Sequence, residues 1–272
     1  MHLFPAIWRY VYALWLAGAA LSAAADEGGK QVADNHRPAI ALIIDDMGNQ
    51  HAQGLRVIDL PGPVACAFLP YGAFTNALAR RAYQRHKEVM LHLPMQAVEH
   101  AHGSQQEGML TLDMTRQQFQ SEFRRAIAAV PHVSGLNNHM GSLLTRHPGS
   151  MAWLMQAIGR RGNLFFVDSR TTKATVAEQL ATEYGIPNIA RKVFLDNEAE
   201  TTAIRAQFRQ LLAEARREGT ALGIGHPRPA TLQVLGEELA HLEEQGIQLI
   251  PVARLIEIQA NRRSTWQASL SR

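Results

Sequence analysis

The chain has 272 residues, of which 46% are hydrophobic and 19% are charged. This composition excludes a disordered or low-complexity chain and is typical of a globular protein with a substantial core. The formal net charge is only +3 and the basic residues are dispersed, so the sequence does not indicate a nucleic-acid-binding surface. The single cysteine, Cys66, lies in an apolar run and cannot form an intramolecular disulfide, so the fold must depend on its core.

The first 25 residues have the pattern of a secretory signal peptide. Arg9 precedes an apolar run at residues 11–20, and small residues follow at positions 22–25. A basic start, an apolar centre and a small-residue cleavage site define such a signal. A retained membrane anchor is the alternative, although the apolar run is short for a spanning helix. We predict cleavage near Ala25, export to the periplasm or cell envelope, no transmembrane segment after cleavage, and a flexible linker at residues 26–37.

From residue 38 onward, short apolar runs alternate with longer amphipathic segments. The almost wholly apolar run at residues 39–44 is typical of a strand that is buried on both faces. Further strands are predicted at residues 64–69, 88–93, 135–137, 165–168, 189–195, 221–225 and 248–252. Helices are predicted at residues 78–86, 115–130, 150–161, 175–184, 201–218 and 229–245. Thr115 is the expected N-cap of the second helix, with Gln118 at the spacing of a capping box.

This strand–helix alternation predicts parallel strands joined by right-handed crossovers. About seven or eight such strands in succession close better into a barrel than into an open sheet. The sequence contains no sign of an internal linker or a long repeat. We therefore predict one barrel-like α/β domain at residues 38–260, followed by a polar C-terminal tail at residues 261–272.

An acidic pair closes the first predicted strand, at the end where parallel folds gather functional groups. Asp45 and Asp46 follow six apolar residues, and two such carboxylates are costly unless they bind a cation or split their pKa values. Neighbours in an extended segment point to opposite sides, so one carboxylate could bind metal while the other accepts a proton. A turn with a helix N-cap is the alternative structural interpretation.

Later strands end in similar groups. His92 and His226 end two of them, and His139 lies in a polar, glycine-flanked loop after a third. Asp168 and Asp196 end two more. Each could be structural alone, but together with the acidic pair they are typical of a site for zinc or a similar ion with an open position for water. Such a metal lowers the pKa of its water, and a carboxylate and a histidine could then serve as base and acid.

Five short segments carry a family resemblance. They are ALIIDDMG at residues 41–48, EVMLHLPM at 88–95, GLNNHMGS at 135–142, FVDSR at 166–170 and GIGHP at 223–227. These segments resemble the divergent polysaccharide deacetylase family, over essentially the whole predicted domain. The resemblance implies the NodB-homology fold, an irregular (β/α) barrel of about seven parallel strands.

By position, the resemblance implies that Asp45 is the catalytic base and Asp46 a metal ligand. His92 matches the first histidine of the His-(Ser/Thr)-x-x-His motif of the standard enzymes, but residues 93–96 supply no second one. His139 is our candidate for that ligand because of its loop context. His226 matches the late histidine that serves as the acid.

The arginine and tryptophan motifs of the standard enzymes have no clear counterpart. We expect Asp168 to contribute to catalysis in their place. The expected substrate-binding residues are Asn138, Ser169, Arg170 and Asp196.

The leading hypothesis is an exported, metal-dependent hydrolase, with zinc as the expected cofactor. Its substrate would be an envelope polysaccharide, such as peptidoglycan, from which it removes N-acetyl groups. The alternative is a non-catalytic envelope protein that keeps the fold and binds glycan or a cell-wall enzyme. The missing standard motifs favour the alternative, whereas the acidic pair and the strand-end histidines oppose it. A third hypothesis, a membrane-anchored structural protein, requires that the signal segment stays uncut.

Overall fold

The computed structural model describes residues 37–100 and 106–270. The predicted signal peptide and nearly all of the predicted linker lie outside the described residues. The chain divides into the units Met1–Arg37 and Pro38–Arg272, and every described helix and strand belongs to the second. No helix in the described part of the chain is both long and apolar enough to cross a membrane.

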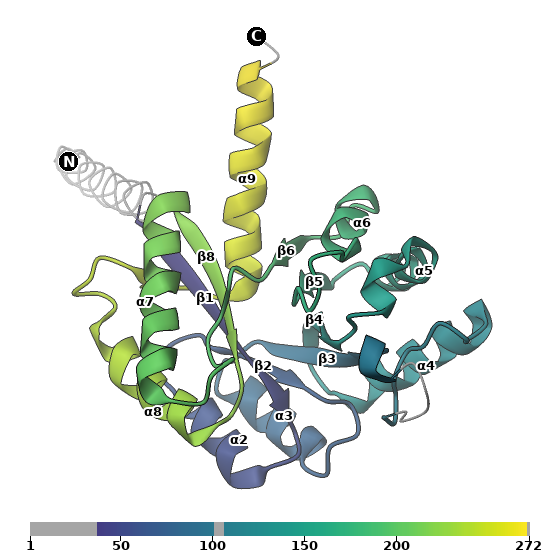
Figure 1. Ribbon diagram of the computed structural model, residues 1–272, viewed down its shortest axis with the longest axis horizontal. Helices are drawn as coiled ribbons and strands as arrows, with labels where there is room; N and C mark the ends of the chain where they lie inside the picture. The colour runs from purple at the N-terminus through teal and green to yellow at the C-terminus, as the bar shows by residue number, and fades with distance from the viewer. Residues whose placement is uncertain (1–36, 101–105, 271–272) are drawn as a thin grey trace, which may run out of the picture. The chain divides into compact units, whose positions relative to one another are not determined.

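Nine strands in the described residues form one parallel sheet (Figure 1). They are β1 (Ala39–Met47), β2 (Ala65–Phe68), β3 (Val89–Met95), β4 (Val133–Met140), β5 (Phe165–Asp168), β6 (Asn188–Ala190), β7 (Val193–Phe194), β8 (Thr220–Gly225) and β9 (Gln248–Leu249). The order along the sheet is β6-β5-β4-β3-β2-β1-β8-β7, and β9 pairs with the beginning of β1. The predicted parallel architecture is confirmed, but the strand predicted at residues 189–195 is divided into β6 and β7.

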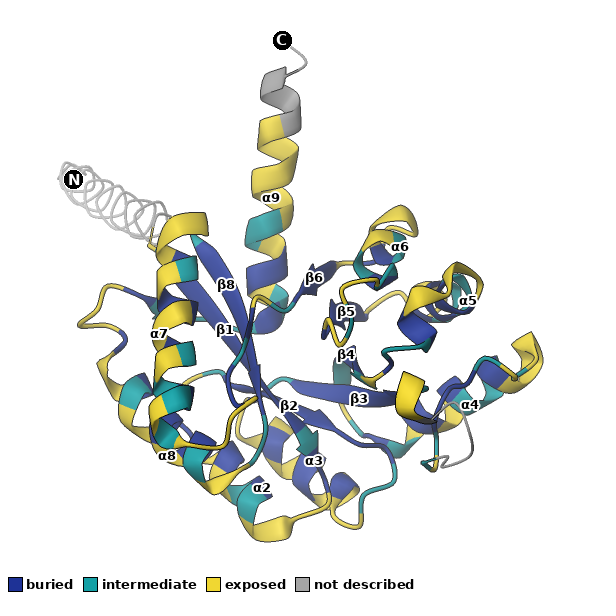
Figure 2. Ribbon diagram, viewed as in Figure 1, coloured by how far each residue is buried: buried dark blue, intermediate teal, exposed yellow. Residues whose placement is uncertain are grey.

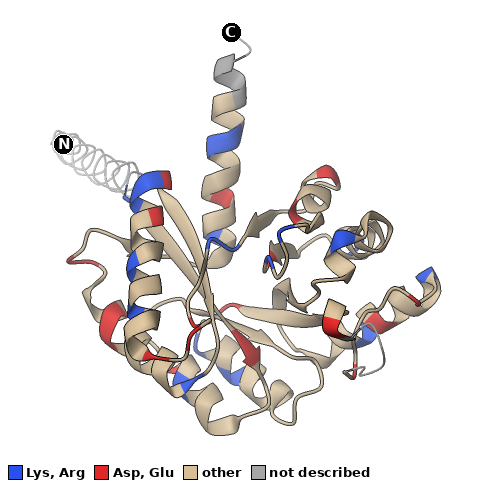
Figure 3. Ribbon diagram, viewed as in Figure 1, with Lys and Arg blue, Asp and Glu red and all other residues tan. Residues whose placement is uncertain are grey.

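Helices follow the strands, and most of them cover the outer side of the sheet. They are α2 (His51–Ile58), α3 (Thr75–Gln84), α4 (Arg116–Ala129), α5 (Pro148–Gly159), α6 (Ala177–Glu183), α7 (Thr201–Glu218), α8 (Pro229–Glu238) and α9 (Val252–Leu270). Single 3-10 turns lie at Val98–His100, Leu144–Arg146 and Leu239–His241. The capping box of α4 is confirmed, because Thr115 and Gln118 bond each other's backbone N–H groups. In the view of Figure 3, the Lys and Arg residues are spread over several helices.

The sheet curls so far that its two edge strands come close together. β6 and β7 lie at opposite ends of the strand order, yet only Arg191 and Lys192 separate them in the chain. Three residue steps span at most about 11 Å. Arg191 N donates to the Asp168 carbonyl on one edge, and Lys192 N donates to the Leu222 carbonyl on the other. The result is the curled, incompletely closed (β/α) barrel that the sequence predicted.

Alternating residues of the strands build two apolar layers. On β1, Ile40, Leu42 and Ile44 join the larger cluster, which includes residues of the surrounding helices. Ala41 and Ile43 point to the other side and join the smaller cluster inside the curled sheet. Both sets are fully buried, as Figure 2 shows for the strands. This burial on both faces explains the continuous apolar run of the first strand.

The first turns of α9 complete the inner layer. Val252, Leu255 and Ile256 pack with the inner residues of the strands. The side chain of Glu88 caps this helix, because it accepts hydrogen bonds from Val252 N (2.5 Å) and Ala253 N (3.0 Å). The polar tail predicted at residues 261–272 is corrected here, since α9 continues to Leu270. Residues 253–270 contain no glycine or proline, so nothing in the local sequence ends the helix.

Candidate metal centre and catalytic site

A β-bulge presents the acidic pair at the end of β1. Ile44 lies opposite Cys66 on β2, but Met47 lies opposite Phe68, so β1 contains one extra residue. Asp46 lies in this bulge with a left-handed φ of 54°. The expectation that the two side chains point to opposite sides is therefore wrong. Asp45 Oδ1 lies 3.6 Å from His92 Nδ1, and Asp46 Oδ1 lies 3.3 Å from His92 Nε2.

Three atoms that could ligate a metal lie close together beside this bulge. Asp46 Oδ1 lies 3.1 Å from His139 Nδ1, which in turn lies 3.0 Å from His92 Nε2. β3 and β4 are adjacent strands. The register that pairs Pro94 of β3 with His139 of β4 brings His139 close to His92. Asp46 Oδ1 is buried and has no hydrogen-bond partner among the described residues, although two imidazole nitrogens lie this close. An orphaned carboxylate oxygen between two imidazoles is the arrangement that a cation satisfies.

The geometry of Asp46, His92 and His139 fits a small divalent ion. A tetrahedral zinc ion with bonds of about 2.0–2.1 Å separates neighbouring ligand atoms by roughly 3.3 Å. The observed separations of 3.0, 3.1 and 3.3 Å correspond to one face of such a tetrahedron. One carboxylate and two imidazoles are also a ligand set that zinc prefers. His139 thus lies where the sequence analysis expected the second histidine ligand.

The charges at this point are strongly coupled. Burial opposes a charged imidazole, but Asp45 and Asp46 raise the pKa of His92 to about 9. Burial also acts to raise the pKa of Asp46, yet the nearby imidazoles of His139 and His92 hold it well below its ordinary value. The carboxylates that retain a proton on His92 would equally attract a cation. Metal binding here would release that proton, as is usual for histidine ligands.

Asp45 has the environment of a proton acceptor. It is only 3% exposed, and this burial raises its pKa despite the opposing charges of His92 and His226. Asn137 Nδ2 donates a 2.8 Å hydrogen bond to Asp45 Oδ1. A carboxylate with a raised pKa accepts a proton more readily near neutral pH than an exposed one does.

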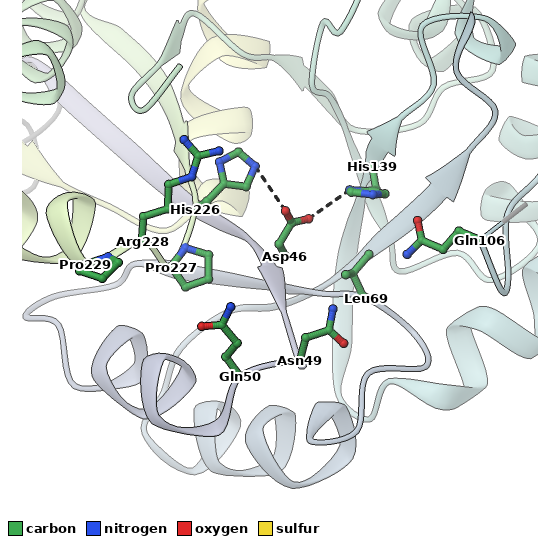
Figure 4. A pocket seen from close by; sticks show the side chains of 10 residues that line it. All are labelled: Asp46, Asn49, Gln50, Leu69, Gln106, His139, His226, Pro227, Arg228 and Pro229. Atoms are coloured by element: carbon green, nitrogen blue, oxygen red, sulfur yellow. Dashed lines mark ion pairs between the residues drawn. The ribbon is translucent and has the colours of Figure 1, made fainter. Parts of the chain in front are cut away.

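His226 faces Asp46 from the opposite side. Its Nε2 lies 3.7 Å from Asp46 Oδ2 (Figure 4). Its Nδ1 lies 2.9 Å from Asp196 Oδ1. Asp196 is fully buried and also accepts from His226 N and from Thr231 Oγ1, both at 2.7 Å. Burial disfavours the imidazolium, but the hydrogen bond and charge of Asp196 outweigh it and raise the pKa of His226. Asp196 is therefore placed to orient His226, while the substrate contact expected for it stays a prediction.

The predicted residues at the end of β5 organise their own loop. Asp168 is 1% exposed, and its two oxygens accept from Arg170 N (2.8 Å) and Thr175 Oγ1 (2.9 Å). The Arg170 side chain extends to Glu178 on α6 at 2.8 Å. These contacts hold Asp168 in the β5–α6 connection, and the catalytic role expected for it stays a prediction.

Asn138 and Ser169 hold the ends of β4 and β5 together. Asn138 Nδ2 donates to the Met140 carbonyl at 2.7 Å, and Asn138 Oδ1 accepts from Ser169 N at 2.9 Å. They are only 1% and 5% exposed, respectively. These hydrogen bonds position the strand ends, and the substrate contact expected for both residues stays a prediction.

A cavity of about 430 Å³ is lined by two of the three candidate ligands, Asp46 and His139, and by His226. Figure 4 shows Asp46 between His139 and His226 on its wall, with the amide side chains of Asn49, Gln50 and Gln106 nearby. Leu69, Pro227, Arg228 and Pro229 complete the lining. A volume of this size suits a small-molecule unit of a larger substrate, and amide groups pair well with hydroxyl groups.

Two residues of the site were not found from the sequence. Asn137 is fully buried and contacts both Asp45 and His92. An asparagine inside a short buried strand next to a predicted site was a usable signal. Arg191 donates from Nε to the Ser169 carbonyl at 2.6 Å, and its charge acts on Asp45. Its place between β6 and β7 depends on how the sheet curls, which local sequence does not reveal.

The fold has relatives among solved structures. The chain matches the crystal structure of uncharacterized protein ATU2773 from Agrobacterium tumefaciens with a TM-score of 0.78 and 20% identity, over 81% of this chain and 89% of the other. It matches peptidoglycan deacetylase PdaC from Bacillus subtilis with a TM-score of 0.53 and 12% identity, over 87% and 98% of the two chains. At these identities the likeness defines the fold, which is that of the NodB-like (β/α) deacetylases.

Relatives with higher sequence identity define the family more closely than the shared fold does. A Haemophilus influenzae protein, described as uncharacterized, is 34% identical over 216 residues, which are 79% of this chain and 76% of the relative. Uncharacterized protein YibQ of Escherichia coli is 36% identical over 203 residues, or 75% of this chain and 63% of its own length. The family model for divergent polysaccharide deacetylases matches residues 42–256. The chain belongs to the divergent polysaccharide deacetylase family.

Proposed function

We propose that this protein is an exported, metal-dependent hydrolase that removes N-acetyl groups from an envelope polysaccharide. One observation carries the proposal: the donor atoms of Asp46, His92 and His139 lie within 3.3 Å of one another, beside Asp45 and His226. Hydrolysis of an amide needs an electrophile at the carbonyl oxygen, a base for water and an acid for the leaving nitrogen. Three of these residues would hold the electrophile, and Asp45 and His226 would act as base and acid; Asp46, His139 and His226 line the cavity.

Each residue has a distinct role in this proposal. A divalent ion, with zinc favoured by the ligand set, would when bound polarise the amide carbonyl and lower the pKa of water. Asp45 accepts the proton of the attacking water. His226 donates a proton from Nε2 to the amide nitrogen as the C–N bond breaks, which leaves a free amine on the sugar and releases acetate. Asp196 keeps His226 in the orientation that this transfer needs.

The class of substrate is supported by the cavity and by the family. Amide side chains and Arg228 line the cavity, and such groups are suited to the hydroxyl groups of a saccharide. One protein with the same fold is a peptidoglycan deacetylase. The secretory pattern of the first 25 residues favours an envelope substrate. N-terminal sequencing of the exported protein tests this location, because an uncut signal segment would contradict it.

Acetate release is the decisive assay. We expect the wild type with added Zn²⁺ to release acetate from N-acetylglucosamine oligomers or peptidoglycan. Asp45→Asn should lower kcat by about 10²- to 10⁴-fold, as expected for the loss of a general base. Asp59→Asn is the matched control, since Asp59 is an exposed carboxylate that pairs with Arg85 away from the cavity.

The assay also separates the two classes of function. If the wild type and Asp45→Asn are equally inert over a panel of N-acetylated glycans, the hydrolase proposal fails. Glycan binding that persists in both proteins would then support a non-catalytic envelope protein.

A further inference from the structure

Asn137 lies between the two halves of the proposed catalytic machinery. It is fully buried on β4, directly opposite His92 of β3 in the strand register. Asn137 Oδ1 lies 2.9 Å from His92 Nδ1, and Asn137 Nδ2 lies 2.8 Å from Asp45 Oδ1. The same amide nitrogen is 3.2 Å from Ser169 Oγ. One amide group thus joins a candidate metal ligand to the candidate base.

The oxygen side of the amide determines how His92 carries its proton. An amide oxygen only accepts hydrogen bonds, so His92 Nδ1 must be the donor. In the neutral ring the lone pair then lies on Nε2, the atom that faces Asp46 and His139. A hydrogen bond to the second ring nitrogen is how proteins fix the tautomer of a metal-binding histidine.

The nitrogen side of the amide acts on Asp45. Its N–H group stabilises a carboxylate oxygen and fixes where that oxygen lies. Ser169 Oγ accepts from the same nitrogen and holds the amide in place. A flipped amide would direct its oxygen at the Asp45 carboxylate and its N–H group at the His92 N–H. The contact between the amide oxygen and the carboxylate would be repulsive in either tautomer of His92, which favours the observed orientation of the amide.

We propose that Asn137 is a positioning residue that sets the metal-binding tautomer of His92 and the position of the Asp45 carboxylate as one unit. The inference rests on the proposed function, in which His92 is a ligand and Asp45 the base. The effect of Asn137 on His92 and its effect on Asp45 can be measured separately, because zinc affinity reports on His92 and turnover reports on Asp45.

Zinc affinity of the full chain, measured by competition with a chromophoric chelator, tests the oxygen side. We expect Asn137→Ala to weaken binding about 10- to 100-fold, the usual effect of removing an outer-shell partner. Asn188→Ala is the matched control, because Asn188 is a buried asparagine of β6 that bonds only to Thr182 and the Ile186 carbonyl among the described residues. Its affinity should remain within about threefold of wild type.

A second variant isolates the nitrogen side. Asn137→Asp keeps an oxygen for His92 Nδ1 but places a second oxygen against Asp45. We expect zinc affinity to be retained within about tenfold, while kcat falls by about 100-fold with little change in KM. A residue with a merely structural role would not divide its effects in this way.

The zinc-loaded wild type supplies a test that does not depend on a variant of Asn137. Long-range ¹H–¹⁵N correlation of the His92 ring, assigned with His92→Gln, should place the proton on Nδ1. A proton on Nε2 overturns the inference, as does an Asn137→Ala protein with wild-type zinc affinity. If the wild type binds zinc but releases no acetate, the proposed hydrolase fails while the tautomer result still decides the role of Asn137. If the wild type binds no zinc, both proposals fall.

Discussion

His92 and His226 face the same carboxylate from two sides, but they have different partners behind them. His92 Nε2 and His226 Nε2 lie 3.3 Å and 3.7 Å from Asp46 oxygens, respectively. The Nδ1 atom of His92 meets the neutral amide of Asn137, whereas that of His226 meets the carboxylate of Asp196. Both Nδ1 contacts are 2.9 Å long, so the charge of the partner, and not the distance, distinguishes the two histidines.

That difference suits the two imidazoles to different chemistry. An amide partner orients a ring but stabilises its charged form less than a carboxylate does, which suits a neutral metal ligand. A carboxylate partner stabilises the imidazolium, which favours a proton donor. The carboxylates that raise the pKa of His92 are those a cation would neutralise, whereas Asp196 remains with His226 whether or not metal is bound. In the proposed function, the second hydrogen bond of each ring distinguishes the ligand from the acid.

The largest effect is expected from a change to a proposed metal ligand. Asp46→Ala removes the carboxylate that lies between the two histidines, and we expect zinc affinity to fall by more than about 100-fold, beyond the usual effect of an outer-shell change. Competition with a chelator measures this, with Asp59→Asn as the control. Unchanged zinc binding would show that Asp46 is not a ligand.

A smaller effect, confined to turnover, is expected from a change to the hydrogen-bond partner of the proposed acid, His226. Asp196→Asn should lower kcat about 100-fold because the imidazolium of His226 loses its charged partner. Zinc affinity should stay within about threefold of wild type. If zinc affinity instead falls as far as in Asn137→Ala, then His226 belongs to the ligand set and the comparison of the two histidines breaks down.

The Asp196–His226 pair should also make the stability of the metal-free protein depend on pH. The pKa of Asp196 is lowered, since the bonds from His226 outweigh its burial, so its contribution is present above the unfolded value near 3.9 and lost as pH falls. The pKa of His226 is raised, so its contribution is complete below about 6.5 and lost at higher pH.

Urea denaturation across this range tests the prediction. Asp196→Asn should lower the free energy of unfolding by about 1–3 kcal/mol near pH 5. The difference from wild type should shrink at pH 3 and at pH 9. A difference that is constant with pH would mean that the two side chains are not an ion pair in the folded protein.

The smallest effect on the site is expected from α9. Leu255→Ala empties part of the inner layer and should lower the free energy of unfolding by about 2–5 kcal/mol. Arg263→Ala, on the exposed part of the same helix, should change it by less than about 0.5 kcal/mol. Zinc affinity of folded Leu255→Ala should equal that of wild type, because α9 does not line the cavity. A weakened site in this variant would show that the inner layer supports the ligands directly.

Much of the fold follows from patterns that are local in the sequence. β5 and α7 have the predicted bounds, and α7 ends where Gly219 adopts a left-handed φ of 78°. Two helices were missed for different reasons. α2 has only eight residues and includes Gly54, while α9 is polar along most of its length. Only the packing of its first turns inside the sheet distinguishes α9 from a tail.

The sequence by itself determined the parallel (β/α) architecture and the candidate residues Asp45, Asp46, His92, His139 and His226. It did so because apolar periodicity fixes the strands, and parallel strands collect their ends at one edge. The tertiary structure decided which of these side chains meet and what each one contacts. The bulge at Asp46 depends on the register with β2, and the partners of the two histidines come from residues 45 and 30 positions away in the chain. Such contacts between distant residues form only when the strands pair in the sheet, and they distinguish the proposed ligand from the proposed acid.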